Sequence, residues 1–286
     1  MEQEPAFWIR KCLDRYVPSL LYQRNVSGGS GCSVWDCALR LDGKTVRVIL
    51  KLFHSEFVNG SGLGPVDSAT KCALALTEFT PWGVPTPKLV GFAQQGHGAA
   101  VLYEKIAGER WDSTTRSEAA RILARLHRIS VDQFSPELRE LVRRSAPNRL
   151  RVLHGLLAFA SDLDTSYPRW RQEHPQLCDT VQELVESGEP ASGRSTLVHG
   201  DFFSANLMLD GNGLHVIDWD LLACGDPMWD LGFLIGADSD VPDTVVNAVV
   251  DAYREGCPVD FDVLEWHKNC WDSFWALRHL LKQVEP

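Results

Sequence analysis

The sequence lacks any run of apolar residues long enough to cross a membrane, and it lacks a C-x-x-C cysteine pair. Because a spanning helix needs about 20 predominantly apolar residues, we expect no membrane as a partner. The eight cysteines are scattered along the chain, which argues against a zinc site and favours free thiols in a reducing cytoplasm. The first residues are acidic where a secretory signal would be basic, so we also expect no export.

Basic residues are scarce as well, since 28 Lys and Arg stand against 38 Asp and Glu, for a formal charge of −10. This balance argues against nucleic acid or an anionic membrane as the main partner, and it would attract cationic ligands. The chain has 286 residues, 44% of them hydrophobic, which suffices for one large domain or for two lobes with a cleft. We expect a monomer or a homodimer.

The chain is organised around residues 197–220, which contain two short apolar segments and a turn, Asp-Gly-Asn-Gly, at residues 210–213. Asn and Gly tolerate positive φ, so the turn predicts a β-hairpin. A rigid hairpin allows Asp201, Asn206 and Asp218 to converge on one point. Two carboxylates and an amide suit a hard cation such as Mg²⁺ better than a soft metal.

The spacing of His199, Asp201 and Asn206 has the form H-x-D-x-x-x-x-N. In a phosphoryl-transfer loop with this spacing, the Asp accepts the proton of a hydroxyl group and the Asn holds a metal ion. A later Asp holds a second metal ion, and here that residue is Asp218, in Ile-Asp-Trp-Asp rather than Asp-Phe-Gly. The alternative is that both aspartates only cap turns and that His199 is a core histidine.

These motifs are followed by Gly-Asp-Pro at 225–227 and Trp-Asp-Leu-Gly at 229–232, and together they resemble the aminoglycoside phosphotransferase and choline kinase-like family. The resemblance is specific over residues 197–235. It implies an α+β, two-lobed protein-kinase-like fold. In this fold a β-rich nucleotide-binding lobe would take residues 1–105, and a larger, mainly helical catalytic and acceptor-binding lobe would take 106–286. It also implies ATP or GTP and Mg²⁺ as cofactors, and a small-molecule acceptor.

The N-terminal half contains a Gly-rich stretch, Gly28, Gly29, Ser30 and Gly31, followed by alternating strands predicted at 34–41 and 45–53. A loop of this composition lets backbone N–H groups approach phosphate oxygens closely, although most such loops are only flexible turns. It is not a Walker A motif, which needs Gly-Lys-Ser/Thr.

Lys51 is flanked by apolar residues on the second predicted strand, where a buried lysine needs an anionic partner. By the resemblance, it contacts the α/β-phosphates, and the alternative is an edge-strand lysine that points to solvent. Such a lysine normally pairs with an acid on the next helix, predicted at 67–79. Asp67 is our first choice for that acid and Glu78 the second, and the alternative for Asp67 is an N-cap.

Residues 104–108 are predicted to form the hinge between the lobes, and by the resemblance the backbone around Glu104 and Ile106 would bind the adenine edge. Helices are predicted from residue 117 onward, and His127 on the first of them is interpreted as structural.

Four acids are candidates for substrate contact: Asp220, Asp226, Asp230 and Glu265. The favoured alternative for Asp226 and Asp230 is that they cap helices and brace the catalytic loop. Because many carboxylates follow the catalytic loop, we expect a polar, cationic acceptor, and the alternative is a solvated acidic face without a ligand. The resemblance suggests an aminoglycoside or another basic antibiotic first, which would make the chain an antibiotic-resistance enzyme, and then an amino alcohol such as choline, or a sugar.

Two rival functions remain open. A protein kinase is disfavoured because the chain lacks Asp-Phe-Gly and Ala-Pro-Glu, and because no activation loop fits between Asp218 and Trp229. A nucleotide-binding pseudokinase that serves as a scaffold is disfavoured because Lys51, Asp201, Asn206 and Asp218 are all present.

Overall fold

The computed structural model of the chain describes most of its residues and divides them into two compact units, each with its own hydrophobic core. The described residues are 5–14, 20–29, 32–41, 43–54, 62–110, 115–145, 149–190, 193–236 and 241–284. Unit 1 comprises Met1–Trp111, Ile129–Ala146 and Ala205–Cys224, and unit 2 comprises Asp112–Arg128, Pro147–Ser204 and Gly225–Pro286. Neither unit is continuous in sequence. The division into a nucleotide lobe at 1–105 and an acceptor lobe at 106–286 stays a prediction.

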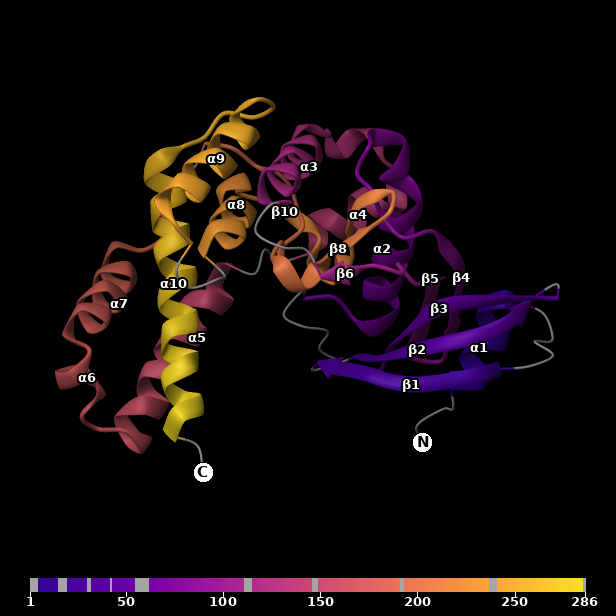
Figure 1. Cartoon of the computed structure of the whole chain (residues 1–286), viewed down its shortest axis with the longest axis horizontal. Coiled ribbons are helices and arrows are strands. Elements are labelled where there is room, and N and C mark those ends of the chain that lie inside the picture. Colours follow the sequence, from indigo (N-terminus) through magenta and orange to yellow (C-terminus); the bar gives the residue numbers. More distant parts are fainter. Residues whose placement is uncertain are drawn as a thin grey trace. The chain divides into compact units, whose positions relative to one another are not determined.

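Unit 1 contains a five-stranded antiparallel sheet in the order β1-β2-β3-β5-β4 (Figure 1). Its strands are β1 (Leu20–Gly29), β2 (Cys32–Leu41), β3 (Lys44–Phe53), β4 (Leu89–Gln95) and β5 (Gly98–Glu104). The two alternating strands predicted from the sequence are therefore confirmed as β2 and β3. They pair in an unbroken register from Cys32 opposite Phe53 to Leu41 opposite Lys44.

The two faces of β3 have different neighbours. Val48, Leu50 and Leu52 are buried in one cluster with the apolar side chains of α1 (Pro5–Leu13). Because successive side chains of a strand point to opposite faces, Lys51 belongs to the other face, where α2 (Pro65–Glu78) packs against β3 and β5. Helix α1 ends at Leu13, and residues 15–19 lie outside the described residues.

The predicted hairpin is confirmed in unit 1. Strands β8 (Leu207–Asp210) and β9 (Gly213–Val216) pair antiparallel across a two-residue turn, in which the N–H of Asn212 donates to Asp210 Oδ1 at 2.8 Å. Gly213 has a φ of 118°, which only glycine adopts without strain. Strand β6 (Glu109–Arg110) pairs with β8. The chain also forms η1 (Thr80–Trp82), η3 (Val131–Gln133), α4 (Pro136–Arg144), η4 (Ser204–Asn206), η5 (Trp219–Leu221) and β10 (Ala223–Gly225).

Unit 2 is mainly helical, as predicted for this part of the chain. Its long helix α10 (Phe261–Val284) packs against α5 (Arg149–Ser166) and α8 (Pro227–Gly236) (Figure 1). The remaining elements are α3 (Arg116–Arg128), α6 (Trp170–Glu173), α7 (Pro175–Ser187), β7 (Thr196–Val198) and α9 (Asp243–Arg254). Aromatic side chains fill the core of this unit, and the rings of Phe233 and Trp271 stack with centroids 3.6 Å apart. Trp271 of α10 is buried in this core, and Trp266, Phe274 and Trp275 pack against it.

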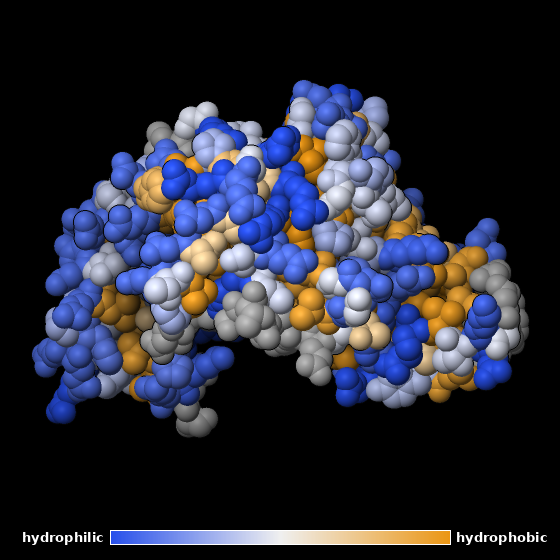
Figure 2. Space-filling view, turned by 45° about the horizontal axis from the view of Figure 1, so that its top comes forward, coloured by the Kyte–Doolittle hydropathy of each residue, from blue (hydrophilic) through white to orange (hydrophobic). Residues whose placement is uncertain are grey.

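Hydrophilic residues cover much of the face in Figure 2, and hydrophobic residues reach the surface at the end that carries the β1–β3 sheet. Leu21, Tyr22 and Val26 on the edge strand β1 are 48%, 42% and 41% exposed. In the part of the chain that the structure describes, no helix combines the length and apolar character needed to cross a membrane. All eight cysteines are free thiols.

Candidate active site

The catalytic-loop sequence of unit 2 is fastened to α8 by one buried carboxylate. Asp230 has no exposed surface, and its two oxygens accept hydrogen bonds from the backbone N–H groups of His199 at 2.6 Å and Gly200 at 2.8 Å. The preceding residue of α8, Trp229, donates its indole N–H to the carbonyl of Gly200 at 3.2 Å. Gly200 has a φ of 84°, a conformation that favours glycine. The loop is thus fixed by its backbone.

His127 and His199 both serve this framework. His127 is 2% exposed, with Nδ1 2.7 Å from the hydroxyl of Tyr253 and Nε2 3.2 Å from Asp230 Oδ2, so its predicted structural role is confirmed. His199 is fully buried, and its Nδ1 accepts a hydrogen bond from the N–H of Asp201 at 3.2 Å. Because Nδ1 accepts, the ring proton of neutral His199 lies on Nε2. His199 therefore orients the backbone of Asp201.

Replacing Asp230 with alanine is expected to lower the free energy of unfolding by about 3 kcal/mol, because several buried donors lose a charged acceptor at once. Urea denaturation would measure this change, with Asp243→Ala on the exposed first turn of α9 as the control. A loss below 1 kcal/mol, comparable to the control, would contradict the bracing role.

Asp201 itself is the partly exposed member of the loop, between the buried residues Gly200 and Phe202. Its carbonyl accepts a hydrogen bond from the N–H of Phe203 at 3.1 Å, and the ring of Phe203 stacks on Phe233 with centroids 4.8 Å apart. The sequence therefore places a carboxylate at the surface of a rigid, backbone-anchored turn. Such a group can accept a proton without any rearrangement of the loop.

In unit 1, Lys51 forms the centre of a buried ionic cluster. It is 2% exposed, and its Nζ lies 2.7 Å from Asp218 Oδ1 and 2.6 Å from Asp220 Oδ2. The prediction that this lysine is buried and needs an anionic partner is confirmed. The alternative, a solvent-facing lysine on an edge strand, is wrong because β3 lies between β2 and β5.

The partner that we predicted for Lys51 is wrong. Asp67 pairs with Arg144 at 2.9 Å, and Glu78 accepts hydrogen bonds from the backbone and side chain of Ser135 at 2.8 and 2.6 Å. Both acids lie near the ends of α2, each beside its own partner from the segment 129–146. The deeply buried position in the middle of α2 is taken by Lys71, a cation that cannot pair with Lys51.

Lys71 is a functional-site neighbour that the sequence reasoning missed. Its Nζ donates to Ser145 Oγ at 2.8 Å and to the carbonyl of Leu222 at 2.7 Å, and the residue has no exposed surface. Burial lowers the pKa of Lys71 to about 8, although the charge of Asp220 opposes this effect. The signal was present in the sequence, since Lys71 lies among alanines and Cys72 on an apolar helix, as Lys51 does on its strand.

Burial and neighbouring charges compete in this cluster. Burial raises the pKa of Asp220 to about 6, against the lowering effect of the nearby Lys51. Burial alone would lower the pKa of Lys51, but the carboxylates of Asp218 and Asp220 raise it well above its usual value. Lys51 therefore remains a cation, as a phosphate-binding group requires.

The structure brings two predicted metal ligands together. The N–H of Ile217 donates to the carbonyl of Asn206 at 2.9 Å, and the hairpin pairs Leu207 with Val216, so Asn206 and Asp218 lie at the same open end of the hairpin. Asp218 adopts a left-handed conformation with φ 66°, and its side chain is 39% exposed. A strained backbone of this kind is typical of functional positions. The exposed carboxylate of Asp218 and the amide of Asn206, which is 7% exposed, are oxygen groups of the kind that Mg²⁺ takes as ligands.

The predicted nucleotide-binding residues are only partly described. Gly28 and Gly29 belong to strand β1 rather than to a loop, since they pair with Ser33 and Cys32, and Ser30 and Gly31 lie outside the described residues. The N–H of Glu104 already donates to the carbonyl of Lys88 at 2.9 Å. The role of the backbone at Ile106 stays a prediction.

The four acids proposed for substrate contact fall into different places. Asp220 and Asp230 are 1% and 0% exposed and contact Lys51 and the backbone of the catalytic loop, so their burial argues against direct contact with a substrate. Asp226 is 1% exposed and accepts a hydrogen bond from the N–H of Met228 at 2.8 Å. It therefore caps α8, which was the favoured alternative to substrate contact for this residue. Glu265 is exposed on α10, and its role stays a prediction.

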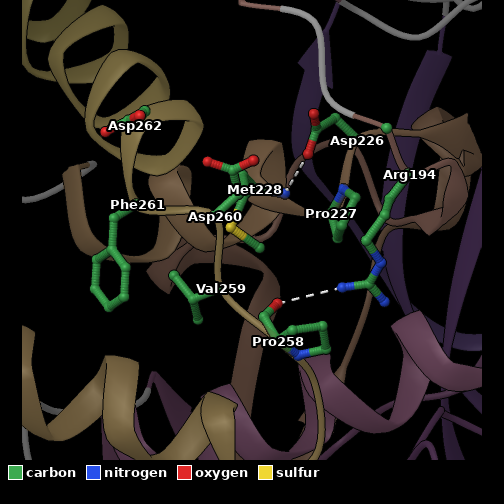
Figure 3. Close-up of a pocket in the computed structure, with 10 residues that line it drawn as sticks. Arg194, Asp226, Pro227, Met228, Pro258, Val259, Asp260, Phe261 and Asp262 are labelled. Carbon is green, nitrogen blue, oxygen red and sulfur yellow. Dashed lines mark hydrogen bonds between the residues drawn. The ribbon is translucent and has the colours of Figure 1, made fainter.

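Asp226 also lines a cavity of about 460 Å³ in unit 2, near the side chain of Arg194, which donates to the carbonyl of Pro258 at 3.2 Å (Figure 3). In the described part of the chain, one group of ligand-type side chains approaches metal-binding dimensions: Glu189, Asp226 and His267 have atoms within 4.8 Å of one another. Asp226 already serves as a helix cap there, and His267 Nε2 lies 3.7 Å from Glu189 Oε1. We interpret the group as an internal polar cluster.

The model of the phosphotransferase enzyme family matches residues 38–267, which is more than half of the chain. This chain belongs to that family. The predicted resemblance and the α+β kinase-like fold are confirmed, and the chain is a small-molecule phosphotransferase that acts on hydroxyl groups. No curated protein matches this phosphotransferase.

Solved structures share the fold of the phosphotransferase at low sequence identity. A spectinomycin phosphotransferase in complex with ADP and spectinomycin is 16% identical, with 93% of this chain and 84% of that chain covered and a TM-score of 0.59. A macrolide 2′-phosphotransferase from Brachybacterium faecium is 17% identical, with 92% and 87% covered and a TM-score of 0.58. A choline kinase from Streptococcus pneumoniae is 18% identical, with 94% and 88% covered and a TM-score of 0.56.

Proposed function

We propose that this phosphotransferase moves the γ-phosphoryl group of Mg²⁺-ATP, or of Mg²⁺-GTP, to a hydroxyl group of a small polar molecule. The observation that carries the proposal is the exposed carboxylate of Asp218, held 2.7 Å from the buried ammonium of Lys51. This arrangement offers an oxygen ligand for a metal ion and a fixed cation for phosphate at one place. A metal-bound triphosphate needs both.

Each residue has a role that its surroundings support. Asp201 accepts the proton of the acceptor hydroxyl, and the fixed loop holds its carboxylate ready for that step. Asn206 and Asp218 would hold Mg²⁺, which neutralises charge on the β- and γ-phosphates when bound. Lys51 binds phosphate oxygens, and the phosphate-binding role of the Gly28–Gly31 stretch stays a prediction. The backbone at Ile106 would bind the adenine edge.

For the acceptor, we propose a cavity of about 640 Å³ in unit 2, lined by residues of α8 and α10. One of its walls is Trp275, whose ring lies 6.3 Å from that of Phe203, two residues after Asp201. The cavity therefore lies close to the catalytic loop within the same unit. A flat aromatic wall with polar groups around it is typical of small-molecule sites.

The acceptor has two candidate charges, positive and negative. The sequence predicts a cation, as found in aminoglycosides, other basic antibiotics and choline. However, three of the acids behind this prediction are buried and no longer support a cationic acceptor: Asp220, Asp226 and Asp230. Two others, Asp238 and Asp240, lie outside the described residues. The second candidate is an anionic acceptor, because the proposed cavity carries Lys268, Arg278 and Lys282 against Asp272.

Ionic strength separates the two candidates. For a polycationic acceptor, we expect KM to rise steeply with added salt, since exposed charges are screened beyond a Debye length of about 8–10 Å. Asp272→Asn should then raise KM, while Arg278→Gln should not. The reverse pattern in these two variants, or a KM that is independent of salt, would contradict the cationic acceptor.

The proposed function is tested by an acceptor screen with nucleotide turnover as the readout. Release of ADP or GDP that depends on both Mg²⁺ and one acceptor, with a phosphate ester as product, is the expected result. Nucleotide binding with no acceptor-dependent turnover across the screen would favour the pseudokinase scaffold instead. We also propose a cytoplasmic location, where nucleotide is present and the free cysteines stay reduced.

A further inference from the structure

Lys51 pairs with Asp218, and the proposed roles assign the same Asp218 to the metal ion. If Asp218 binds the metal ion of the nucleotide, its negative charge is shared with that ion, and Lys51 needs another partner to stay in place. In protein kinases that partner is an acid on the helix after the lysine strand, and movement of that helix controls activity. In this chain the acids of α2 pair elsewhere: Asp67 with Arg144 and Glu78 with Ser135.

Asp218 and Asp220 differ in exposure although they are two residues apart. The side chain of Asp218 is 39% exposed, whereas that of Asp220 is 2% exposed, and each lies within 2.7 Å of Lys51 Nζ. At the start of η5, the carboxylate of Asp218 is partly exposed to solvent and that of Asp220 lies in the interior. Asp218 can therefore reach a metal ion, whereas Asp220 faces the interior, where Lys51 contacts it.

Lys71 completes the interior side of the cluster. It is bound to the carbonyl of Leu222, two residues after Asp220, and to Ser145, and its charge acts on Asp220. The rings of Phe79 and Trp219, 4.7 Å apart, pack η5 against the end of α2. Without a metal ion, the charges of two lysines and two aspartates in this cluster cancel. When Asp218 binds a metal ion, Lys51, Lys71 and Asp220 together carry one positive charge, which can attract phosphate.

We propose that Asp220 is the positioning residue for Lys51, in place of an acid on α2, and that Lys71 balances its charge. This inference rests on the proposed function, because it assigns Lys51 and Asp218 to the bound nucleotide. The consequence is that Lys51 is held by the same η5 segment that follows the metal ligand. An outward shift of α2 would not remove an acidic partner from Lys51, as it does in a protein kinase.

The test measures ATP binding by calorimetry at a series of Mg²⁺ concentrations, with the folded state of each variant checked by circular dichroism. Asp220→Asn should raise the Kd for Mg²⁺-ATP by about tenfold, the usual worth of one charge-assisted hydrogen bond. It should also raise the Mg²⁺ concentration needed for half-maximal ATP binding, because Lys51 then competes with the metal ion for Asp218. A purely structural role would leave this midpoint unchanged.

Asp67→Asn is the matched comparison, since it removes the same charge from the acid that a kinase-like arrangement would use. It should leave both the Kd and the Mg²⁺ midpoint unchanged. Where Asp220→Asn does not fold, the double variant Asp220→Asn with Lys71→Met restores the balance of buried charge, and Met fills a similar volume. The double variant should fold and still show the raised midpoint.

The outcomes are distinct. If Asp67→Asn raises the Kd and the midpoint, or if the Asp220 variants keep the wild-type values, the inference is overturned while the proposed function stands. If the wild-type chain binds neither Mg²⁺-ATP nor Mg²⁺-GTP, the proposed function is overturned, and the positioning role falls with it.

Discussion

Asp201→Asn is expected to lower kcat by about 10²–10⁴, the usual contribution of a positioned general base. Asparagine has nearly the same shape as aspartate, and the backbone of the loop around residue 201 is held by hydrogen bonds to Asp230 and His199. The fold should therefore survive the change. The Kd for Mg²⁺-nucleotide should stay close to the wild-type value, because the acid acts on the acceptor.

The measurement is steady-state turnover with the best acceptor from the screen, together with calorimetric nucleotide binding. Asp251→Asn is a suitable control, since the side chain of Asp251 on α9 is 77% exposed. Near-normal kcat in Asp201→Asn would remove Asp201 from the mechanism. A loss of nucleotide binding as large as the loss of kcat would show that it acts on the nucleotide instead.

The second large effect concerns the metal ion. Asp218→Asn should weaken Mg²⁺-ATP binding by about tenfold or more, because a hard cation loses a charged oxygen ligand. Binding of an acceptor alone should be unaffected. Lys51 keeps Asp220 at 2.6 Å in this variant, so the buried lysine retains a counter-ion and the fold should be preserved.

Calorimetry with and without Mg²⁺ distinguishes the metal role from a general loss of structure. Asp210→Asn provides the comparison, since Asp210 lies at the turn end of the same hairpin and pairs with His215. ATP binding in the presence of a chelator should change far less than binding with Mg²⁺. An unchanged Mg²⁺-ATP affinity in Asp218→Asn would contradict the assignment of Asp218 to the metal ion.

Local patterns determined the parts of this protein that depend on short-range geometry. Backbone preferences and the alternation of side chains act over short stretches of sequence. They predicted the turn at 210–213 and the strands β2 and β3, and the motif spacing singled out Asp201, Asn206 and Asp218. The same stretch carried the family resemblance, which the match over residues 38–267 confirmed. The family of the chain was thus readable from the sequence, whereas the surroundings of the candidate site were not.

The tertiary structure decided which charges meet. Lys51 pairs with Asp218, 167 residues away, and with Asp220, rather than with the acids that follow it in sequence. Periodicity shows that a strand or helix has a buried face, but it does not show which side chain of another element covers that face. For the same reason the sequence left Lys71 unnoticed and offered Asp220 and Asp230 as substrate contacts. Burial of both acids follows from long-range packing, which alternation within one segment cannot reveal.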